Sequence, residues 1–148
     1  MMLQSRPIHV LLIEDNPGDV RLMQEAFKDI KIATTLSVTT DGEEAVQYLR
    51  KETPFASAQT PDFILLDLNL PKRDGREVLK IIKNDPVMRV IPVVILTTSN
   101  AEQDILHSYN LHVNSYINKP VDFDKFFDIV QKIEHFWLST AILPTMLR

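Results

Sequence analysis

The sequence predicts one α/β domain, built on a doubly wound, five-stranded parallel sheet with helices on both faces. Short apolar or β-branched runs alternate five times with stretches in which apolar residues recur at helical spacing. The first run, residues 8–13, is apolar almost throughout, as in a strand that is buried on both faces. A length of 148 residues suits one domain with one sizeable core. Because crossovers between parallel strands are right-handed, the intervening helices are expected to cover both faces.

Each expected strand is short and is followed by polar or turn-forming residues. The segment from Thr53 to Pro61 is rich in Pro, Ala, Ser and Thr, which indicates a loop before the third strand. Pro92 stands near the start of the fourth strand. In chain order, the expected strands cover residues 8–13, 36–38, 63–66, 90–96 and 116–117.

Capping signals place the helices between these strands. Asp41 with Glu44, and Ser99 with Glu102, have the spacing of a capping box, and Asp122 is suited to cap a last helix. The third helix should end at the Asn84-Asp85-Pro86 stretch. The apolar residues of the other expected helices are Val20, Met23, Phe27 and Ile30; Ala45, Val46 and Leu49; Val78, Leu79 and Ile82; and Phe123, Phe126, Val130, Ile133 and Trp137.

Composition excludes several classes of protein. The net charge is −4, so the chain has no basic bias that would indicate nucleic-acid binding. There are no cysteines, which removes disulfides, thiolate zinc sites and a cysteine nucleophile and fits a cytoplasmic protein. No apolar run approaches the ~18 residues of a membrane span.

We expect the domain to cover residues 1–138, with a C-terminal tail, 139–148, as a candidate interface segment.

Polar residues follow four of the five expected strands. Glu14 and Asp15 follow the first, Asp67 the third and Thr97 the fourth, and Lys119 comes soon after the fifth. In open parallel sheets, ligands bind at the carboxyl ends of the strands. Any of these residues alone is more often a turn, cap or solvated residue. Their convergence on one rim is what predicts a functional site.

The acids on this rim predict a divalent cation. Three carboxylates in one place repel one another unless a cation holds them ionised or one pKa rises. Oxygen ligands favour Mg²⁺. We expect Asp15 and Asp67 to bind the ion directly, Glu14 through water, and the backbone carbonyl of Asn69 to add an oxygen.

The same rim is suited to receive a phosphoryl group. Phosphoryl transfer depends mainly on positioning and on charge stabilisation. Lys119 can neutralise the side opposite the metal, and Thr97 can donate a hydroxyl hydrogen bond. Asp67 is the best candidate for the acceptor, because it follows a buried strand and precedes a turn that begins at Leu70-Pro71.

These residues, in this order, resemble the receiver domains of two-component response regulators over roughly Ile8 to Ile133. The stretch Asp67-Leu68-Asn69-Leu70-Pro71, followed by Asp74-Gly75, is similar to the phosphoacceptor strand and loop of that family. The resemblance implies a flavodoxin-like fold with strand order 2-1-3-4-5. It also implies a histidine kinase as phosphoryl donor and Mg²⁺ as cofactor, for which Mn²⁺ can substitute.

The resemblance implies further roles for individual residues. Asp67 would be phosphorylated, Glu14 and Asp15 would hold the metal, and Thr97 and Lys119 would contact the phosphoryl group. Thr97 and Tyr116 would form the switch, and the Lys119-Pro120 bond is a candidate cis peptide. Family members often have Gly-Ala before the fifth strand, whereas this chain has Asn110-Leu111. The stretch 14–19 and Phe136-Trp137-Leu138 are similar to the small single-domain response regulators of bacterial, cyanobacterial-type phytochromes.

We therefore expect a cytoplasmic signalling module that is not an enzyme beyond promoting its own phosphorylation and dephosphorylation. Its output would pass to an unidentified downstream protein, with no nucleic-acid or membrane partner. A homodimer is expected through the face of the fourth helix, fifth strand and fifth helix. The interface candidates are aromatic: Phe123, Phe127, Phe136 and Trp137.

Two alternatives compete with this interpretation. A haloacid-dehalogenase-type phosphatase would need a second aspartate at position 69, where this chain has Asn69, and the three glycines form no nucleotide-binding loop. A degenerate receiver that acts only as a docking adaptor is disfavoured by the complete set of acids, threonine and lysine. The four histidines share no ligand spacing and are assigned no chemistry.

Overall fold

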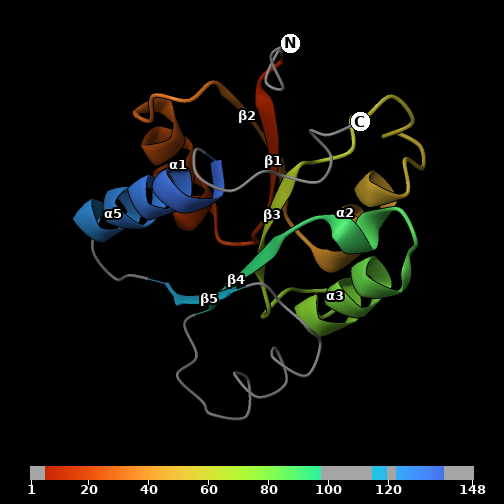
Figure 1. Cartoon of the computed structure of the whole chain (residues 1–148). Helices are drawn as coiled ribbons and strands as arrows, with labels where there is room; N and C mark the ends of the chain where they lie inside the picture. The colour runs from red at the N-terminus through yellow and green to blue at the C-terminus, as the bar shows by residue number, and fades with distance from the viewer. Residues whose placement is uncertain (1–5, 98–114, 120–122, 139–148) are drawn as a thin grey trace.

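The computed structural model describes residues 6–97, 115–119 and 123–138. Its strands form one parallel sheet in the order β2-β1-β3-β4-β5, as predicted (Figure 1). The strands are β1 Ile8–Ile13, β2 Thr34–Thr39, β3 Phe63–Asp67, β4 Val93–Thr97 and β5 Ser115–Asn118. The helices are α1 Pro17–Lys28, α2 Gly42–Leu49, α3 Gly75–Asn84 and α5 Phe123–Ile133, with shorter turns η1 Met88–Val90 and η2 Glu134–Leu138.

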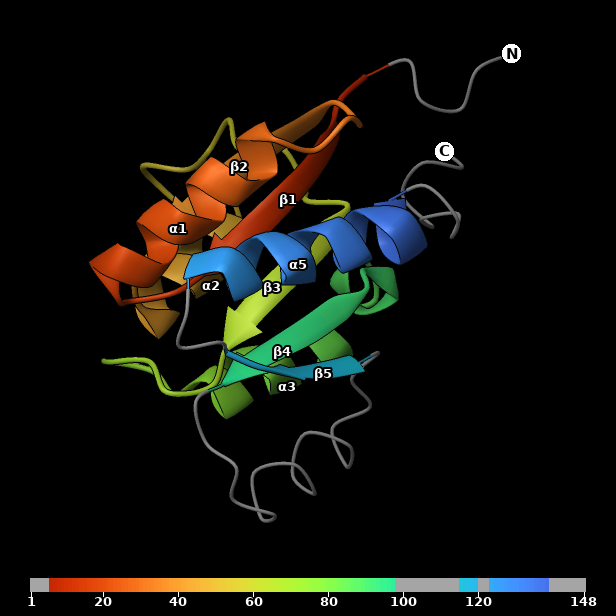
Figure 2. The ribbon, with the colours of Figure 1, turned by 90° about the vertical axis from the view of Figure 1, so that its left-hand side faces the viewer.

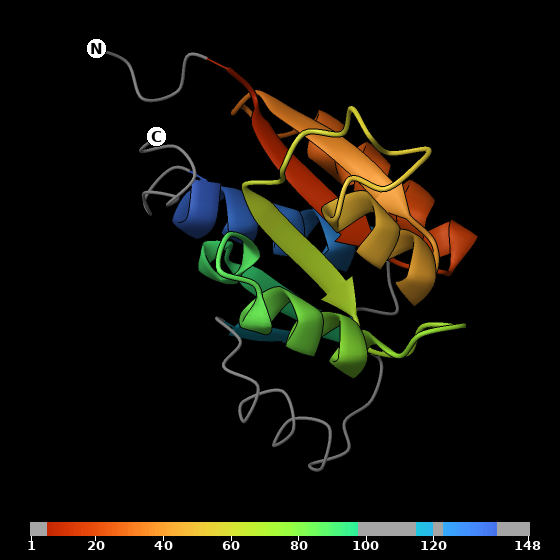
Figure 3. The same ribbon diagram turned by 90° about the vertical axis from the view of Figure 1, so that its right-hand side faces the viewer.

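Helices cover both faces of the sheet. Figure 2 shows α1 and α5 together on one face, and Figure 3 shows α2 and α3 on the other. The pleat of β1 divides its side chains between two cores: Val10 and Leu12 pack under α1 and α5, whereas Leu11 and Ile13 pack under α2 and α3. All six residues of β1 are buried, which explains why its sequence is a continuous apolar run rather than an alternating one.

Side-chain caps begin the helices near the carboxyl end of the sheet. Asn16 accepts a hydrogen bond from the Asp19 amide at 3.0 Å, and Pro17 occupies the first turn of α1. Asp41 accepts from the Glu44 amide at 2.7 Å, which confirms the predicted cap of α2. Each cap places a helix N-terminus directly after a strand, so the βα turns stay short and defined.

Several predicted strand boundaries were wrong by one to three residues, and the largest difference is at the fourth strand. The fourth strand begins at Val93 rather than Val90, because residues 88–90 form the 3₁₀ turn η1. Asp85 stabilises this turn by accepting from the amides of Val87 and Met88, and Pro92 has no amide to donate to a strand. The last helix changes at residue 134 into the π-helical turn η2.

A buried ion pair anchors the opposite end of β1. The carboxylate of Asp62 is fully buried and accepts two hydrogen bonds from the Arg6 guanidinium, at 2.6 and 2.7 Å. It also accepts from the His9 amide at 2.9 Å. His9 itself is buried, with Nε2 at 2.8 Å from the Ser37 hydroxyl and 3.0 Å from the Tyr48 hydroxyl. This network joins β1, β2 and α2 far from the rim that carries the candidate site.

Several predicted features lie outside the described residues. They are the helix opening at Ser99, the Asn110-Leu111 stretch, Pro120, the Asp122 cap and the tail 139–148. For Thr97, Tyr116, Phe123 and Trp137 the structure describes the backbone alone. Among the described helices, none is both long and apolar enough to cross a membrane.

Candidate functional site

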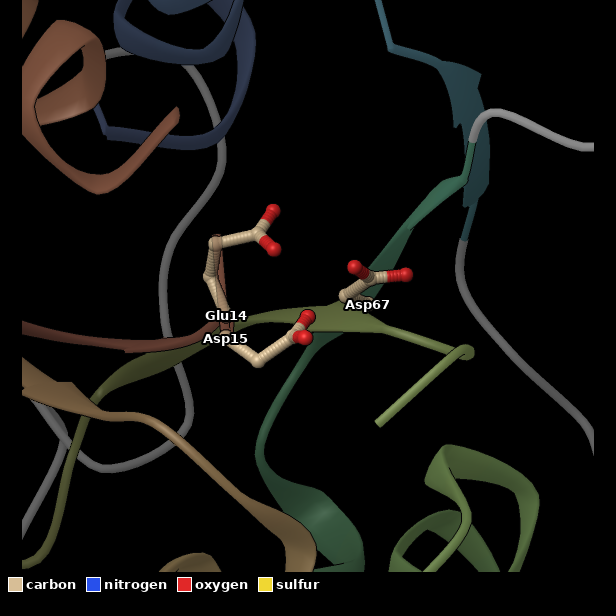
Figure 4. A group of neighbouring side chains, drawn as sticks. All are labelled: Glu14, Asp15 and Asp67. Carbon is tan, nitrogen blue, oxygen red and sulfur yellow. The ribbon is translucent and has the colours of Figure 1, made fainter. Parts of the chain in front are cut away.

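Three predicted acids meet at the carboxyl ends of β1 and β3. Glu14 and Asp15 follow β1, and Asp67 is the last residue of β3. One carboxylate oxygen of each lies within 4.8 Å of those of the other two, and Figure 4 shows the side chains clustered with Asp15 pointing toward Asp67. Glu14 is 1% exposed and Asp67 4%, whereas Asp15 is exposed. The predicted convergence of these acids is therefore present in the fold.

Lys119 enters the same cluster from the end of β5. Its Nζ lies 3.0 Å from Asp67 Oδ2 and 3.0 Å from Asp19 Oδ2, and it forms a third ion pair with Glu14 Oε1. The Lys119 side chain is only 5% exposed. An ammonium group has three donors, so these three carboxylates are enough to satisfy it.

Sequence reasoning missed Asp19 as a partner of Lys119. It lies in the first turn of α1, one helical turn beyond the acids of β1. An acidic residue in a first helical turn is usually explained by the helix dipole, so nothing in the sequence links it to a lysine 100 positions away. The Glu14-to-Asp19 stretch stood out only for its family resemblance.

Burial and charge shift two pKa values at this rim. Burial raises the pKa of Glu14 to about 7, and the ion pair with Lys119 only partly opposes this shift. For Lys119, burial lowers the pKa, but hydrogen bonds to Glu14 and Asp67 outweigh burial and raise it overall. Lys119 is therefore a permanent positive charge at neutral pH, whereas Glu14 readily takes up a proton.

The acid cluster fits a hard divalent cation. Its donors are carboxylate oxygens alone, which suit Mg²⁺ or Mn²⁺ better than a softer metal. Asp15 is exposed, so the cluster is open to solvent on one side. Glu14 and Asp67 are buried and already close together, which is favourable only when a positive charge compensates them.

The end of β3 and the loop after it are tightly held. The Asn69 amide donates to Asp67 Oδ1 at 3.0 Å, and the Gly75 amide donates to the Leu68 carbonyl at 2.9 Å. A Cβ at position 75 would lie 2.4 Å from the Asp67 carbonyl oxygen, so only glycine allows α3 to begin this close to the strand.

The same loop docks on the start of α2. The Gly42 amide donates to the Pro71 carbonyl at 3.3 Å, and Arg73 forms an ion pair with Glu43 at 3.1 Å. A Cβ at position 42 would lie 1.9 Å from the Arg73 carbonyl oxygen. Lys72 adopts a left-handed backbone conformation, with φ of 67°, in the part of the loop that turns against α2. The loop that follows Asp67 is therefore packed tightly against the start of α2.

The backbones of the remaining predicted residues lie where expected. Thr97 ends β4 and pairs with Asn118 of β5, and Tyr116 of β5 pairs with Ile95 of β4. Their switch roles, the phosphoryl contact of Thr97 and the cis peptide at Lys119-Pro120 remain predictions. So does the metal contact of the Asn69 carbonyl.

Fold and rim together define a receiver domain, and comparison with known proteins agrees. The family model described as "Response regulator receiver domain" matches residues 10–131, and the chain belongs to this family. It is a response regulator of two-component signalling, a class that accepts a phosphoryl group on an aspartate from a histidine kinase. Receiver domains bind a divalent metal.

Proteins similar to this chain over nearly its whole length include a phytochrome response regulator. The chain is 47% identical to response regulator Rcp1 of Synechocystis sp. over 138 residues, 93% of this chain and 94% of that protein. The crystal structure of the phosphorylated cyanobacterial phytochrome response regulator RcpA matches with a TM-score of 0.90 and 53% identity, covering 94% of this chain and 99% of RcpA. The Mn²⁺-bound form of Rcp1 matches with a TM-score of 0.89 and 47% identity, covering 93% of this chain and 99% of Rcp1.

Proposed function

We propose that Asp67 is the phosphoacceptor and that Mg²⁺, held by Asp15 and Asp67 with Glu14 nearby, supports the transfer. The observation that carries this proposal is that Asp67 lies beside the ammonium group of Lys119 and within a group of carboxylates that could hold a cation. Lys119 Nζ lies 3.0 Å from Asp67 Oδ2 and also pairs with Glu14, and one carboxylate oxygen of Asp67 lies within 4.8 Å of those of Glu14 and Asp15. A group transfer that passes through a dispersed, anionic transition state requires this arrangement.

The proposed step has a simple atom balance. A carboxylate oxygen of Asp67 forms a bond to phosphorus while the bond between phosphorus and the kinase's histidine nitrogen breaks, and the electron pair returns to the imidazole. The cation supplies charge neutralisation at the phosphoryl oxygens. Lys119 neutralises the opposite side, and the Thr97 hydroxyl donates to a phosphoryl oxygen. Water then reverses the modification by hydrolysing the acyl phosphate, so that the protein promotes chemistry on itself alone.

The direct test is transfer from a radiolabelled histidine kinase to wild type and to Asp67→Asn. Wild type should take up label in the presence of Mg²⁺, and the variant should take up none. Asp29→Asn is a matched control, because it changes an exposed aspartate at the end of α1. Labelling of Asp67→Asn at the wild-type level would disprove the assignment. Labelling without added divalent cation, in the presence of a chelator, would disprove the role of the metal.

We further propose that the kinase partner is a phytochrome. Two similarities support a phytochrome as the kinase. The chain is similar to Rcp1 over nearly its whole length, and it is similar to the phytochrome response regulator RcpA. A phytochrome kinase should phosphorylate this chain at least tenfold faster than a histidine kinase from an unrelated pathway under equal conditions. Equal rates would refute a dedicated phytochrome partner and leave the acceptor assignment intact.

A homodimer through α5 and its neighbours is also proposed. Phe136 in η2 is 54% exposed, which is unusual for a large aromatic side chain, while Phe127 packs partly against the core. The described residues give no side-chain position for Phe123 or Trp137, so their part in the interface stays a prediction. Sizing in solution with Mg²⁺ and beryllofluoride should show a dimer that Phe136→Glu weakens. A monomer under all conditions would refute this surface. A cytoplasmic location likewise stays a prediction.

A further inference from the structure

Asp19 is an acidic residue that shares Lys119 with the proposed phosphorylation site without belonging to the acid cluster. Its Oδ2 lies 3.0 Å from Lys119 Nζ, the same distance as Asp67 Oδ2. Among the described residues, the group that could hold a metal comprises Glu14, Asp15 and Asp67, and Asp19 is not part of it. Lys119 therefore bridges two kinds of carboxylate: two that belong to the group that could hold a metal and one that does not.

The position of Asp19 is well defined. Its amide is capped by Asn16 at 3.0 Å, Pro17 restricts the backbone of the same turn, and the Val20 amide donates to the Asn16 carbonyl at 3.0 Å. Its side chain is 23% exposed, so it meets Lys119 at the edge of the site, where the ammonium would otherwise face water. A carboxylate on a capped helical turn is a rigid anchor for a long, flexible lysine side chain.

A divalent cation changes the balance of forces on Lys119. The ion attracts the carboxylates of Glu14 and Asp67, which weakens their contacts with the ammonium. It also repels the ammonium directly, since both carry positive charge. Of the three described ion pairs of Lys119, the pair with Asp19 is the one whose carboxylate is not a candidate metal ligand, so a bound ion should weaken it least. Without it, Lys119 would be expected to move toward solvent when the metal binds.

We propose that Asp19 is a positioning residue that keeps Lys119 beside Asp67 in the metal-loaded site, so that the ammonium group faces the incoming phosphoryl oxygens. This inference rests on the proposed function of Asp67. It assigns Asp19 no contact with the phosphoryl group or the metal. Its effect is transmitted through Lys119 alone, and it should therefore be visible in the state of that side chain.

The test compares wild type with Asp19→Ala and the near-isosteric Asp19→Asn, with and without Mg²⁺. The first measurement is the ¹⁵N-detected ammonium signal of Lys119, assigned by its disappearance in Lys119→Arg; only protected, hydrogen-bonded ammonium groups give such signals. In wild type the signal should persist when Mg²⁺ is added. In Asp19→Ala it should be present without Mg²⁺ and be lost on its addition, and Asp19→Asn should fall between the two.

The second measurement is the affinity for beryllofluoride in saturating Mg²⁺. Asp19→Ala should bind about tenfold more weakly than wild type, the order expected for one lost hydrogen bond to a charged group. Simple removal of a negative charge would instead strengthen binding of this anion, so equal or tighter binding by Asp19→Ala overturns the proposal. Weaker binding with an unchanged Lys119 signal also overturns it.

Asp124→Ala is the matched control, because it removes an exposed acid from the first turn of α5. It should leave the Lys119 signal and beryllofluoride affinity unchanged. If Asp124→Ala also loses the Lys119 signal in Mg²⁺ and binds beryllofluoride more weakly, the effect comes from removing any acid in a first helical turn, and the proposed role of Asp19 is wrong. If wild type fails to bind beryllofluoride, the proposed function fails and this inference with it. If wild type binds and the Asp19 variants match it, only this inference fails.

Discussion

The packing of Gly42 against the loop that follows Asp67 gives a quantitative prediction. In Gly42→Ala, the new Cβ would lie 1.9 Å from the Arg73 carbonyl oxygen, 2.7 Å from its carbonyl carbon and 2.8 Å from its Cβ. Ordinary van der Waals contact begins near 3.4 Å, so the carbonyl has to retreat from 1.9 Å by about 1.5 Å. The obstacle is backbone, which no side-chain rotation can relieve.

Two consequences follow from this displacement. Overpacking of this kind costs about 1–3 kcal/mol, and we expect Gly42→Ala to lose about 2 kcal/mol in the free energy of unfolding. The loop also connects Asn69 to Gly75, and it is tied to α2 by the Gly42 amide and by Arg73 with Glu43. Moving it should disturb the end of β3, and Mg²⁺ affinity should therefore fall several-fold.

Urea unfolding and calorimetric titration with Mg²⁺ measure these two effects. Gly18→Ala is the matched control, since its Cβ would meet only the Asn16 Oδ1 atom, at 3.2 Å. Alanine is favoured over glycine in a helix, so this control should be neutral or more stable by up to about 1 kcal/mol. If Gly42→Ala unfolds like wild type and binds Mg²⁺ equally well, the proposed seating of the loop is wrong.

Four further predictions concern other buried charges and polar groups. Because the pKa of Glu14 is about 7, Mg²⁺ affinity should rise roughly tenfold between pH 6 and pH 8, and Glu14→Gln should flatten this dependence in calorimetric titrations. Arg6→Ala removes the two guanidinium hydrogen bonds to the buried Asp62 and should cost about 2 kcal/mol in urea unfolding; this is below the usual range for a broken buried pair, because the Arg6 side chain is 37% exposed. Tyr48→Phe removes the hydroxyl at His9 Nε2 and should cost about 1 kcal/mol. Burial lowers the pKa of His9, so its stabilising contribution is complete above about pH 6.5 and is lost as the pH falls below that value. The raised pKa of Glu14 has the opposite effect, because it increases stability as the pH falls from about 7 to 4.5. The pH series should therefore be measured in the Glu14→Gln variant. If the stability of that variant does not fall from pH 7 to pH 5, the role of His9 is wrong.

Much of the fold was predictable because its signals are local. The continuous apolar run of β1 indicates burial on both faces, and the alternation of such runs with helical patterns indicates a parallel sheet with helices on either side. Asp41 caps α2 through a contact three residues away, which a sequence pattern can express. The start of β4 was missed because two local signals compete there: the apolar residues favour a strand, while Asp85 and Pro92 favour a turn.

The sequence could predict only those site residues that follow the ends of parallel strands, because the fold brings these strand ends together. Strand ends of a parallel sheet share one edge, so Glu14, Asp67 and Lys119 could be placed together from the sequence alone. Asp19 and Gly42 could not be predicted in this way. Their importance depends on how a helix start is oriented against a strand end or a loop, and such tertiary distances leave no periodic signal in the sequence.

In the proposed function, the charge of the assembled rim links the proton, the metal and the phosphoryl group. Glu14, Asp15, Asp19 and Asp67 with one ammonium, Lys119, have a formal charge of −3 when all are ionised. Burial makes this charge costly, and burial raises the pKa of Glu14. A divalent cation reduces the same charge to −1 and allows Glu14 to remain ionised. A dianionic phosphoryl group would then approach the proposed acceptor Asp67 without facing an uncompensated cluster of carboxylates, so we expect metal binding to precede transfer.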